Sequence, residues 1–273
     1  MKRKKIIIEL IWIMIWLITI VLIIVSKFKV DTKLIMNNAN MSSTIVYDST
    51  NDKILYQNNI HQKMLPASLT KVLTALVAYK NIDLNKVVQI NYDMINIEGS
   101  RIYLEEDDLV TVNDLMYGMI LQSGNDASVA IQYAYSNNPE DFIMKMNEEI
   151  ETLNLKNSLF NNVTGLDTNE YNYTTTYDYA MIVKEVLKYE YLKTLLGVKK
   201  YQITLDNKKL TVTHKHKLLF NEDYIIGGKT GYTKKAGRTL LSIFENNEHS
   251  IIIVTFNISN DWNVHRNLAQ KFL

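Results

Sequence analysis

PASLTKVLTALVA, residues 66–78, combines an apolar helix pattern with a serine and a lysine that such a helix does not need for packing. Apolar side chains cover nearly every side of the segment, at Val72, Leu73, Ala75, Leu76 and Tyr79. Cover of this kind is typical of a central, buried helix, which we expect over residues 68–80. Ser68 in the first turn and Lys71 one turn later then share a face.

Ser68 and Lys71 have the residue types of a nucleophile and its base. A serine hydroxyl is a weak nucleophile and needs a base within hydrogen-bond reach. A lysine amine can serve when burial, another cation or a helix dipole disfavours its charged form. The spacing alone is weak evidence, because Ser26 and Lys29 share it. Taken singly, Ser68 fits a helix N-cap and Lys71 a lysine that reaches out to solvent.

Two further motifs strengthen the chemical interpretation. LQSGNDASVA, residues 121–130, carries Ser123 and Asn125 at the start of another apolar helix. GGKTGYTKKAG, residues 227–237, opens a strand and contains Lys229, Thr230 and Gly231. Ser-x-Asn recurs elsewhere in the chain, whereas Lys-Thr-Gly does not.

Ser-x-x-Lys, Ser-x-Asn and Lys-Thr-Gly, in this order, describe the active site of penicillin-recognising acyl-serine enzymes. The chain resembles the D-alanyl-D-alanine carboxypeptidases of the low-molecular-mass penicillin-binding type over roughly residues 44–266. The resembling stretches include EGSRIYLEEDDLVTVNDLMYGMILQSGNDASVAI, LFNNVTGLD and YTTTYDYAMI. The resemblance implies a mixed α/β fold of the β-lactamase/transpeptidase type, with an antiparallel sheet from both chain ends and a helical subdomain.

The resemblance also implies roles in removing the last D-alanine from peptidoglycan stem pentapeptides. Ser68 would attack the carbonyl between two D-alanines, and Lys71 would take its proton. Ser123 would relay a proton to the departing D-alanine, and Asn125 would hold the peptide amide. β-Lactam antibiotics would be covalent inhibitors.

The remaining implied roles concern the substrate carboxylate and the oxyanion. Lys229 and Thr230 would contact the terminal carboxylate, and Gly231 would let the strand approach closely. The backbone N–H groups of Ser68 and Tyr232 would form the oxyanion hole.

Arg266 falls about where the family places a further carboxylate-binding arginine. With Lys229 it would supply local positive charge in a mildly acidic domain. The alternative is a solvated arginine on the last helix. No metal or other cofactor is expected.

The N-terminus, MKRKKIIIELIWIMIWLITIVLIIVSKFK, pairs a basic cluster with a long apolar run. Residues 6–25 would span about 30 Å as a helix, enough to cross a bilayer. We expect a cytoplasmic stub and single-pass anchor over residues 1–30, a linker over 31–43 and an extracytoplasmic catalytic domain over 44–273. A cleaved signal peptide is the alternative, although no A-x-A-like site follows.

Charge and cysteine content exclude other classes of protein. Residues 1–30 hold six Lys/Arg and one Glu, so the remaining chain carries 24 basic against 28 acidic residues, a net charge of −4. No basic stripe with interleaved aromatics follows the predicted anchor, which argues against nucleic-acid binding. The absence of cysteine excludes disulfides, thiolate catalysis and Cys-type zinc sites.

The pattern beyond the predicted anchor runs from strands to helices and back to strands. STIVYDSTNDKILYQNN reads as a hairpin, and helices are expected near 111–121, 125–135, 139–153 and 175–188. YQITL, LTVTH, TLLSIF and SIIIVTFNI read as strands before a closing helix over 261–273. We therefore predict one sheet made of both chain ends, with a helical insert.

Several other functions are weighed against the carboxypeptidase. A class A β-lactamase has Ser-Asp-Asn where this chain has Ser123-Gly-Asn125. It also needs a glutamate that activates the deacylating water, and the candidate Glu170 follows a Gly-Leu-Asp that resembles carboxypeptidases instead. A non-catalytic sensor would be expected to have lost a motif residue. Cutting D-alanyl cross-links uses the same acyl-enzyme chemistry and remains open. His214 and His216 suggest two solvated histidines rather than a metal site.

Overall fold

The computed structural model describes residues 12–14, 16, 41–167, 171–206, 208–247 and 249–273. The chain divides into two units, Met1–Ala39 and Asn40–Leu273. Residues 12–14 and 16 are helical, and the rest of the predicted anchor lies outside the described residues. Within the described part of the chain, no helix combines the length and hydropathy needed to cross a bilayer.

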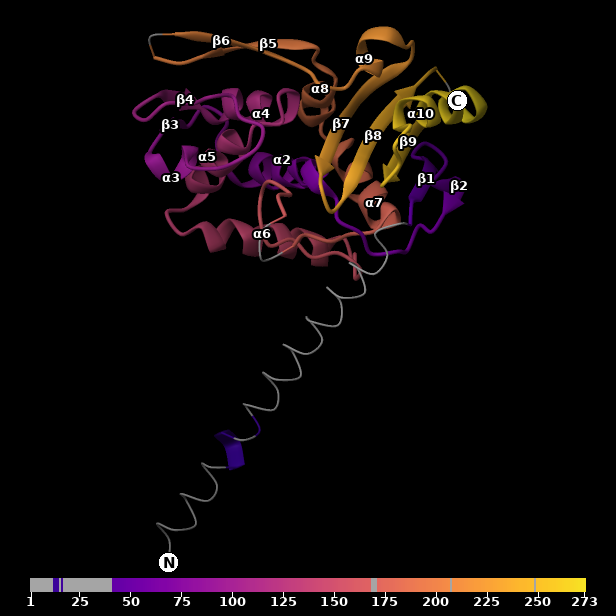
Figure 1. Ribbon diagram of the computed structural model, residues 1–273, viewed down its shortest axis with the longest axis horizontal. Helices are drawn as coiled ribbons and strands as arrows, with labels where there is room; N and C mark the ends of the chain where they lie inside the picture. The colour runs from indigo at the N-terminus through magenta and orange to yellow at the C-terminus, as the bar shows by residue number, and fades with distance from the viewer. Residues whose placement is uncertain (1–11, 15, 17–40, 168–170, 207, 248) are drawn as a thin grey trace, which may run out of the picture. The chain divides into compact units, whose positions relative to one another are not determined.

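The second unit is built on an antiparallel sheet that joins both ends of the unit (Figure 1). Its strand order is β2-β1-β9-β8-β7. The strands are β1 (Ser43–Asp48), β2 (Lys53–Asn58), β7 (Ile225–Thr233), β8 (Gly237–Glu245) and β9 (Ser250–Phe256). The first two form the predicted hairpin. β1 then pairs with β9, which confirms that the two ends of the unit meet in one sheet.

Both faces of β9 are covered, and its side chains alternate between two apolar clusters. On β9, Ile251 and Ile253 belong to a small apolar cluster with Ala269 of α10 (Asp261–Phe272). Ile252 and Val254 belong to the main core with the central helices. A strand buried on both faces reads as a continuous apolar run, which explains SIIIVTF.

The helical part surrounds α2 (Thr70–Asn81), whose residues 70–78 are all buried. It follows a 3₁₀ turn, η1 (Ala67–Leu69), so the predicted helix exists with a tighter first turn. The other predicted helices are also confirmed. They are α4 (Val112–Leu121), α5 (Asn125–Tyr135), α6 (Pro139–Thr152) and α7 (Thr176–Val186), and α8 (Glu190–Gly197) follows.

Side-chain caps fix two of these helix starts. Thr111 accepts a hydrogen bond from the N–H of Asp114, and Thr175 accepts one from Asp178. α6 instead begins with proline at its first position, and Asp141 lies in its first turn.

Some sequence expectations need correction. YQITL and LTVTH form β5 (Lys200–Thr204) and β6 (Lys209–Thr213), which pair only with each other and do not join the main sheet. Lys-Thr-Gly lies in the second half of β7 rather than at the opening of a strand.

Short elements were not predicted. They are β3 (Val87–Gln89), β4 (Leu109–Thr111), α3 (Tyr92–Ile95) and α9 (Leu218–Asn221). With these additions, the predicted fold class is confirmed: an antiparallel sheet from both ends of the unit carries a helical subdomain.

Candidate active site

Ser68 and Lys71 stand where the 3₁₀ turn becomes α2. The Lys71 Nζ donates to Ser68 Oγ at 3.1 Å and to the carbonyl of Thr164 at 2.7 Å. Lys71 has no exposed surface, whereas Ser68 is partly accessible. A nucleophile open to the solvent therefore lies within hydrogen-bond reach of a buried amine.

Burial changes the proton affinity of Lys71. Loss of solvation, with a smaller contribution from the positive charge of Lys215, lowers the pKa of Lys71 to about 7. The carboxylate of Asp126 acts in the opposite direction. Near neutral pH a substantial fraction of Lys71 is therefore the free amine, the form that can accept a proton.

Ser123 is the second hydroxyl of the site. It lies in the turn between α4 and α5 with a left-handed backbone, φ 61°, and is buried. The Lys229 Nζ donates to Ser123 Oγ at 2.9 Å and to the Thr230 carbonyl at 2.8 Å. Burial, then the charges of Lys71 and Lys215, lower the pKa of Lys229 well below its usual range.

Both hydroxyls open into one cleft of about 350 Å³. Its lining residues are Ser68, Ser100, Ser123, Lys215, Lys217, Thr230, Gly231, Tyr232, Arg238 and Trp262. The cleft thus collects one residue or more from each of the three sequence motifs. It brings two serine hydroxyls, each bonded to a buried lysine, against the edge strand β7.

Gly231 permits the close approach of β7 to the 3₁₀ turn. A Cβ at this position would lie 2.3 Å from Thr239 Oγ1 and 3.0 Å from the Ser68 nitrogen. Thr239 is itself fixed, because its hydroxyl donates to the Pro66 carbonyl at 2.9 Å. The backbone next to Tyr232 therefore runs beside the Ser68 N–H, while the Tyr232 side chain is 67 % exposed.

Asn125 is buried next to the cleft. Its backbone N–H donates to the carbonyl of Ser100 at 2.7 Å, and its amide donates to the carbonyl of Glu98 at 2.7 Å. The neighbouring Asp126 carboxylate accepts the N–H groups of Ile102, Tyr103 and Leu104. These bonds tie segment 98–104 to the Ser-x-Asn turn.

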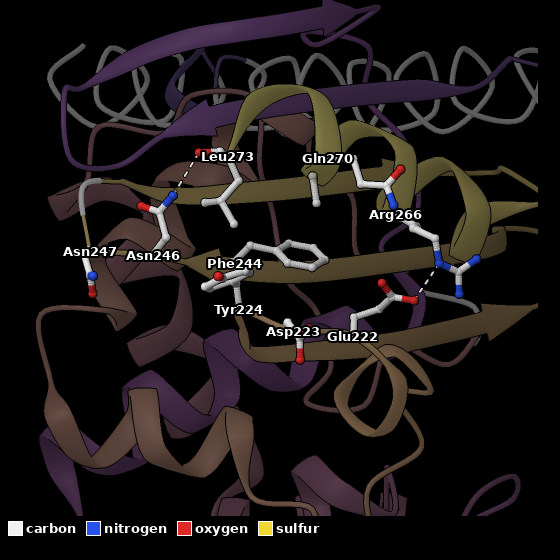
Figure 2. A pocket seen from close by; sticks show the side chains of 10 residues that line it. Glu222, Asp223, Tyr224, Phe244, Asn246, Asn247, Arg266, Gln270 and Leu273 are labelled. Carbon is white, nitrogen blue, oxygen red and sulfur yellow. Dashed lines mark hydrogen bonds and ion pairs between the residues drawn. The ribbon is translucent and has the colours of Figure 1, made fainter.

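Arg266 does not reach the cleft, so its predicted place in the site was wrong. It lines a separate groove of about 630 Å³ with Glu222, Tyr224 and Phe244. Figure 2 shows its guanidinium directed at Glu222, and the Nε–Oε1 distance is 2.6 Å. The physical reason is its position on α10, from which the side chain reaches Glu222 in the loop before β7.

Arg238 is the arginine that the cleft does contain. It comes from β8, and its Nε and Nη2 each donate to the Asp261 carboxylate at 3.0 Å. Its guanidinium carbon lies 5.7 Å from the centre of the Trp262 ring. No motif in the sequence predicts that Arg238 lines the cleft. Its partners Asp261 and Trp262 lie at the start of α10, far along the chain from Arg238.

His214 and His216 are buried, so the expectation that they are solvated was wrong. The Nε2 of His216 lies 2.9 Å from both the Leu241 carbonyl and Ser242 Oγ. Burial lowers the pKa of His216 to about 3. Within the described residues, His, Cys, Asp and Glu side chains form no group of three suited to a metal ion. Glu170 lies outside the described residues.

Comparisons with known proteins agree with this geometry. A sequence profile of the D-alanyl-D-alanine carboxypeptidase family matches residues 30–260, and the chain belongs to this family. It is 34 % identical over 223 residues to the D-alanyl-D-alanine carboxypeptidase DacF of Bacillus subtilis, covering 80 % of this chain and 57 % of DacF. The chain therefore spans little more than half the length of that relative.

Two further similar proteins carry the names of an endopeptidase and a transpeptidase. A D-alanyl-D-alanine endopeptidase of Haemophilus influenzae is 26 % identical over 235 residues, covering 84 % of this chain and 79 % of that protein. A mutant form of the Streptomyces K15 DD-transpeptidase superposes with a TM-score of 0.74 at 26 % identity, covering 78 % of this chain and 88 % of that chain.

Proposed function

We propose that the chain is a serine D-Ala-D-Ala carboxypeptidase that removes the terminal D-alanine of peptidoglycan stem pentapeptides through an acyl-enzyme on Ser68. The observation that carries the proposal is the 3.1 Å hydrogen bond from the buried Lys71 amine to the accessible Ser68 hydroxyl. Family membership supports the substrate class.

Acylation begins at Ser68. The free amine of Lys71 accepts the hydroxyl proton while the oxygen attacks the carbonyl between the two D-alanines. Negative charge develops on the carbonyl oxygen, and the N–H groups of Ser68 and Tyr232 receive it. A preorganised donor of this kind is worth about 3 kcal/mol of transition-state stabilisation.

The leaving amine then needs a proton. Ser123 supplies it from its hydroxyl and recovers the proton that Lys71 took from Ser68, so that Ser123 relays this proton to the amine while Lys229 holds the Ser123 oxygen by a hydrogen bond. Thr230 and Lys229 hold the terminal carboxylate, and Asn125 positions the peptide amide. Water then hydrolyses the ester on Ser68 and regenerates the hydroxyl. A β-lactam enters the same reaction, because its ring amide is attacked like the peptide, and it stays on Ser68 as a covalent inhibitor.

We also propose that the apolar run at residues 6–25 anchors the chain and that the catalytic domain, 44–273, lies outside the cytoplasm. The support is the length of the run together with the basic cluster before it. Membrane fractionation of cells, followed by protease treatment of intact spheroplasts, tests both parts. A catalytic domain that stays protected from the protease would contradict the orientation.

The enzymatic proposal is tested with the full chain and a Ser68→Ala control. Each is incubated with pentapeptide and cross-linked muropeptides, and the products are read by mass spectrometry. Loss of one terminal alanine by the wild type alone is the expected result. Cleavage of cross-linked dimers instead would favour the endopeptidase, an activity that the name of the Haemophilus influenzae relative states for that protein. No product from either sample would refute hydrolysis of this substrate and favour a non-catalytic sensor.

A further inference from the structure

Two lysines, Lys215 and Lys217, line the cleft without a part in the reaction described above. His214, Lys215, His216 and Lys217 follow β6, and their side chains alternate between the interior and the surface. The two histidines are buried, whereas both lysines line the cleft. Lys215 and Lys217 therefore face the same space as Ser68 and Ser123.

Lys215 differs from Lys217 in being fixed at two points. Its backbone N–H donates to the carbonyl of Leu121 at 3.1 Å, at the end of α4 and just before Ser123. Its Nζ donates to Ser100 Oγ at 3.0 Å. Ser100 is fixed in turn, because its carbonyl accepts the N–H of Asn125 at 2.7 Å. The ammonium group of Lys215 is thus held in register with the Ser-x-Asn turn.

Three charged or titratable side chains from other elements act electrostatically around Lys71. Lys229 comes from β7, Asp126 from α5 and Lys215 from the segment after β6. The pKa of Lys71 is lowered first by burial and then by Lys215, and it is raised by Asp126. Because Lys215 is an exposed residue, salt can screen its charge.

We propose that Lys215 is a positioning residue for acylation: its ammonium group, held by Ser100 in the cleft that Ser68 lines, places a positive charge beside the Ser68–Lys71 pair and so favours transfer of the Ser68 proton to the amine. The inference rests on the proposed acyl-enzyme function. It assigns no contact between Lys215 and the reacting atoms.

The test measures the acylation rate constant of the full chain at saturating fluorescent penicillin from about pH 5.5 to 9. Saturation removes any effect of the cleft charges on capture of the anionic drug. Lys215→Met loses the charge and keeps the length of the side chain. We expect its acid limb to move up by about 0.5–1 pH unit, which lowers the rate about threefold to tenfold below the limb and leaves it unchanged on the alkaline plateau.

Two variants serve as controls. Lys215→Arg keeps the charge and should restore the wild-type limb. Lys217→Met removes a positive charge from the same cleft, but not the one that is held against Ser100, so its limb should stay in place. Raising the salt concentration should narrow the difference between Lys215→Met and the wild type.

Other outcomes overturn the inference. A uniform rate loss at every pH in Lys215→Met would mean that Lys215 only supports the local structure. An unshifted limb, or an equal shift in Lys217→Met, would also contradict it. These results differ from failure of the proposed function, in which the wild type itself would not be acylated.

Discussion

At the scale of single residues, the account depends on the ionisation of Lys71. Its pKa is lowered to about 7, chiefly because the side chain has no exposed surface. The base form therefore dominates above this pH and falls tenfold for each unit below it. We expect the acylation rate of the wild type to rise with pH up to about 7 and then to level off. Stopped-flow acylation by a β-lactam measures this profile, and a profile that stays flat down to pH 5 would contradict the role of Lys71.

The buried amine of Lys71 is expected to lower the stability of the fold while it supports acylation. Its pKa is about 7 in the folded chain against an ordinary value of 10.5, so the unfolded chain binds more protons between these pH values. Stability should therefore rise with pH across this window. Lys71→Met removes the cost of burying the amine and should raise the free energy of unfolding by about 4 kcal/mol at pH 7, while acylation is lost. Urea unfolding at pH 7 and 9.5 tests this, because the gain should shrink at the higher pH.

A side chain at Gly231 is expected to disturb the site for steric reasons. A methyl group there would lie 2.3 Å from Thr239 Oγ1, so β7 would have to move away from the 3₁₀ turn. Because oxyanion geometry is sensitive to such shifts, Gly231→Ala should lower acylation at least a hundredfold. Gly227→Ala, on the same strand, is a control for general strand damage. Equal effects of the two substitutions on acylation would argue against a special role for Gly231.

At the scale of elements, Asp126 joins α5 to segment 98–104. Its carboxylate accepts N–H groups from Ile102, Tyr103 and Leu104 and has no exposed surface. Asp126→Asn replaces an acceptor with an amide donor facing these groups, which should cost about 3 kcal/mol of stability.

Asp126→Asn should shift the acid limb of the acylation profile in the direction opposite to Lys215→Met. Because Asp126 raises the pKa of Lys71, Asp126→Asn should move the acid limb of acylation to lower pH. Asp93→Asn, an exposed change on α3, is the control for loss of a negative charge. Chemical denaturation and the acylation profile check both parts, and a limb that moves to higher pH would refute the electrostatic account.

The elements also show what a sequence can predict. Helix α2 was predictable because apolar residues on nearly all sides indicate a buried helix. The three motifs were predictable because serine, lysine and asparagine at these spacings are the residue types of an acyl-serine active site. β5 and β6 were misplaced because their alternation does not say which strand is the neighbour. Lys215 was missed because its contact with Ser100 joins residues 115 positions apart.

At the scale of the whole molecule, the sheet joins both ends of the unit by pairing β1 with β9, and three histidines are buried in this unit. His214, His216 and His265 are buried, and burial lowers the pKa of each below its usual range. His265 Nδ1 lies 2.7 Å from Ser242 Oγ, and its Nε2 lies 2.9 Å from Thr255 Oγ1. The folded unit therefore keeps these rings neutral.

Acid should destabilise the unit for this reason. The unfolded chain takes up protons on these histidines below about pH 6.5. The folded chain resists, so stability is lost as the pH falls below about 6.5. His216, whose pKa is lowered to about 3, contributes about 1.4 kcal/mol per pH unit across this range, and His214 and His265 act in the same direction. Thermal unfolding between pH 7 and 4 measures the slope. His265→Gln should reduce it, and equal slopes in both proteins would contradict this explanation.

The tertiary structure determines which arginine, Arg238 or Arg266, lines the cleft. Both arginines follow Lys-Thr-Gly in the chain, but the strand pairing sets Arg238 opposite Tyr232, and α10 carries Arg266 to Glu222. Sequence position alone placed Arg266 in the cleft, because the path of the chain back across the sheet is not visible in a short motif.

The central claim is that Ser68 forms the acyl-enzyme. The most direct test incubates the full chain with benzylpenicillin, measures its intact mass, and then maps the modified peptide. The account predicts one added penicilloyl group, located within residues 66–78, and none in Ser68→Ala. An unmodified wild type, or a label that persists in Ser68→Ala, would contradict it.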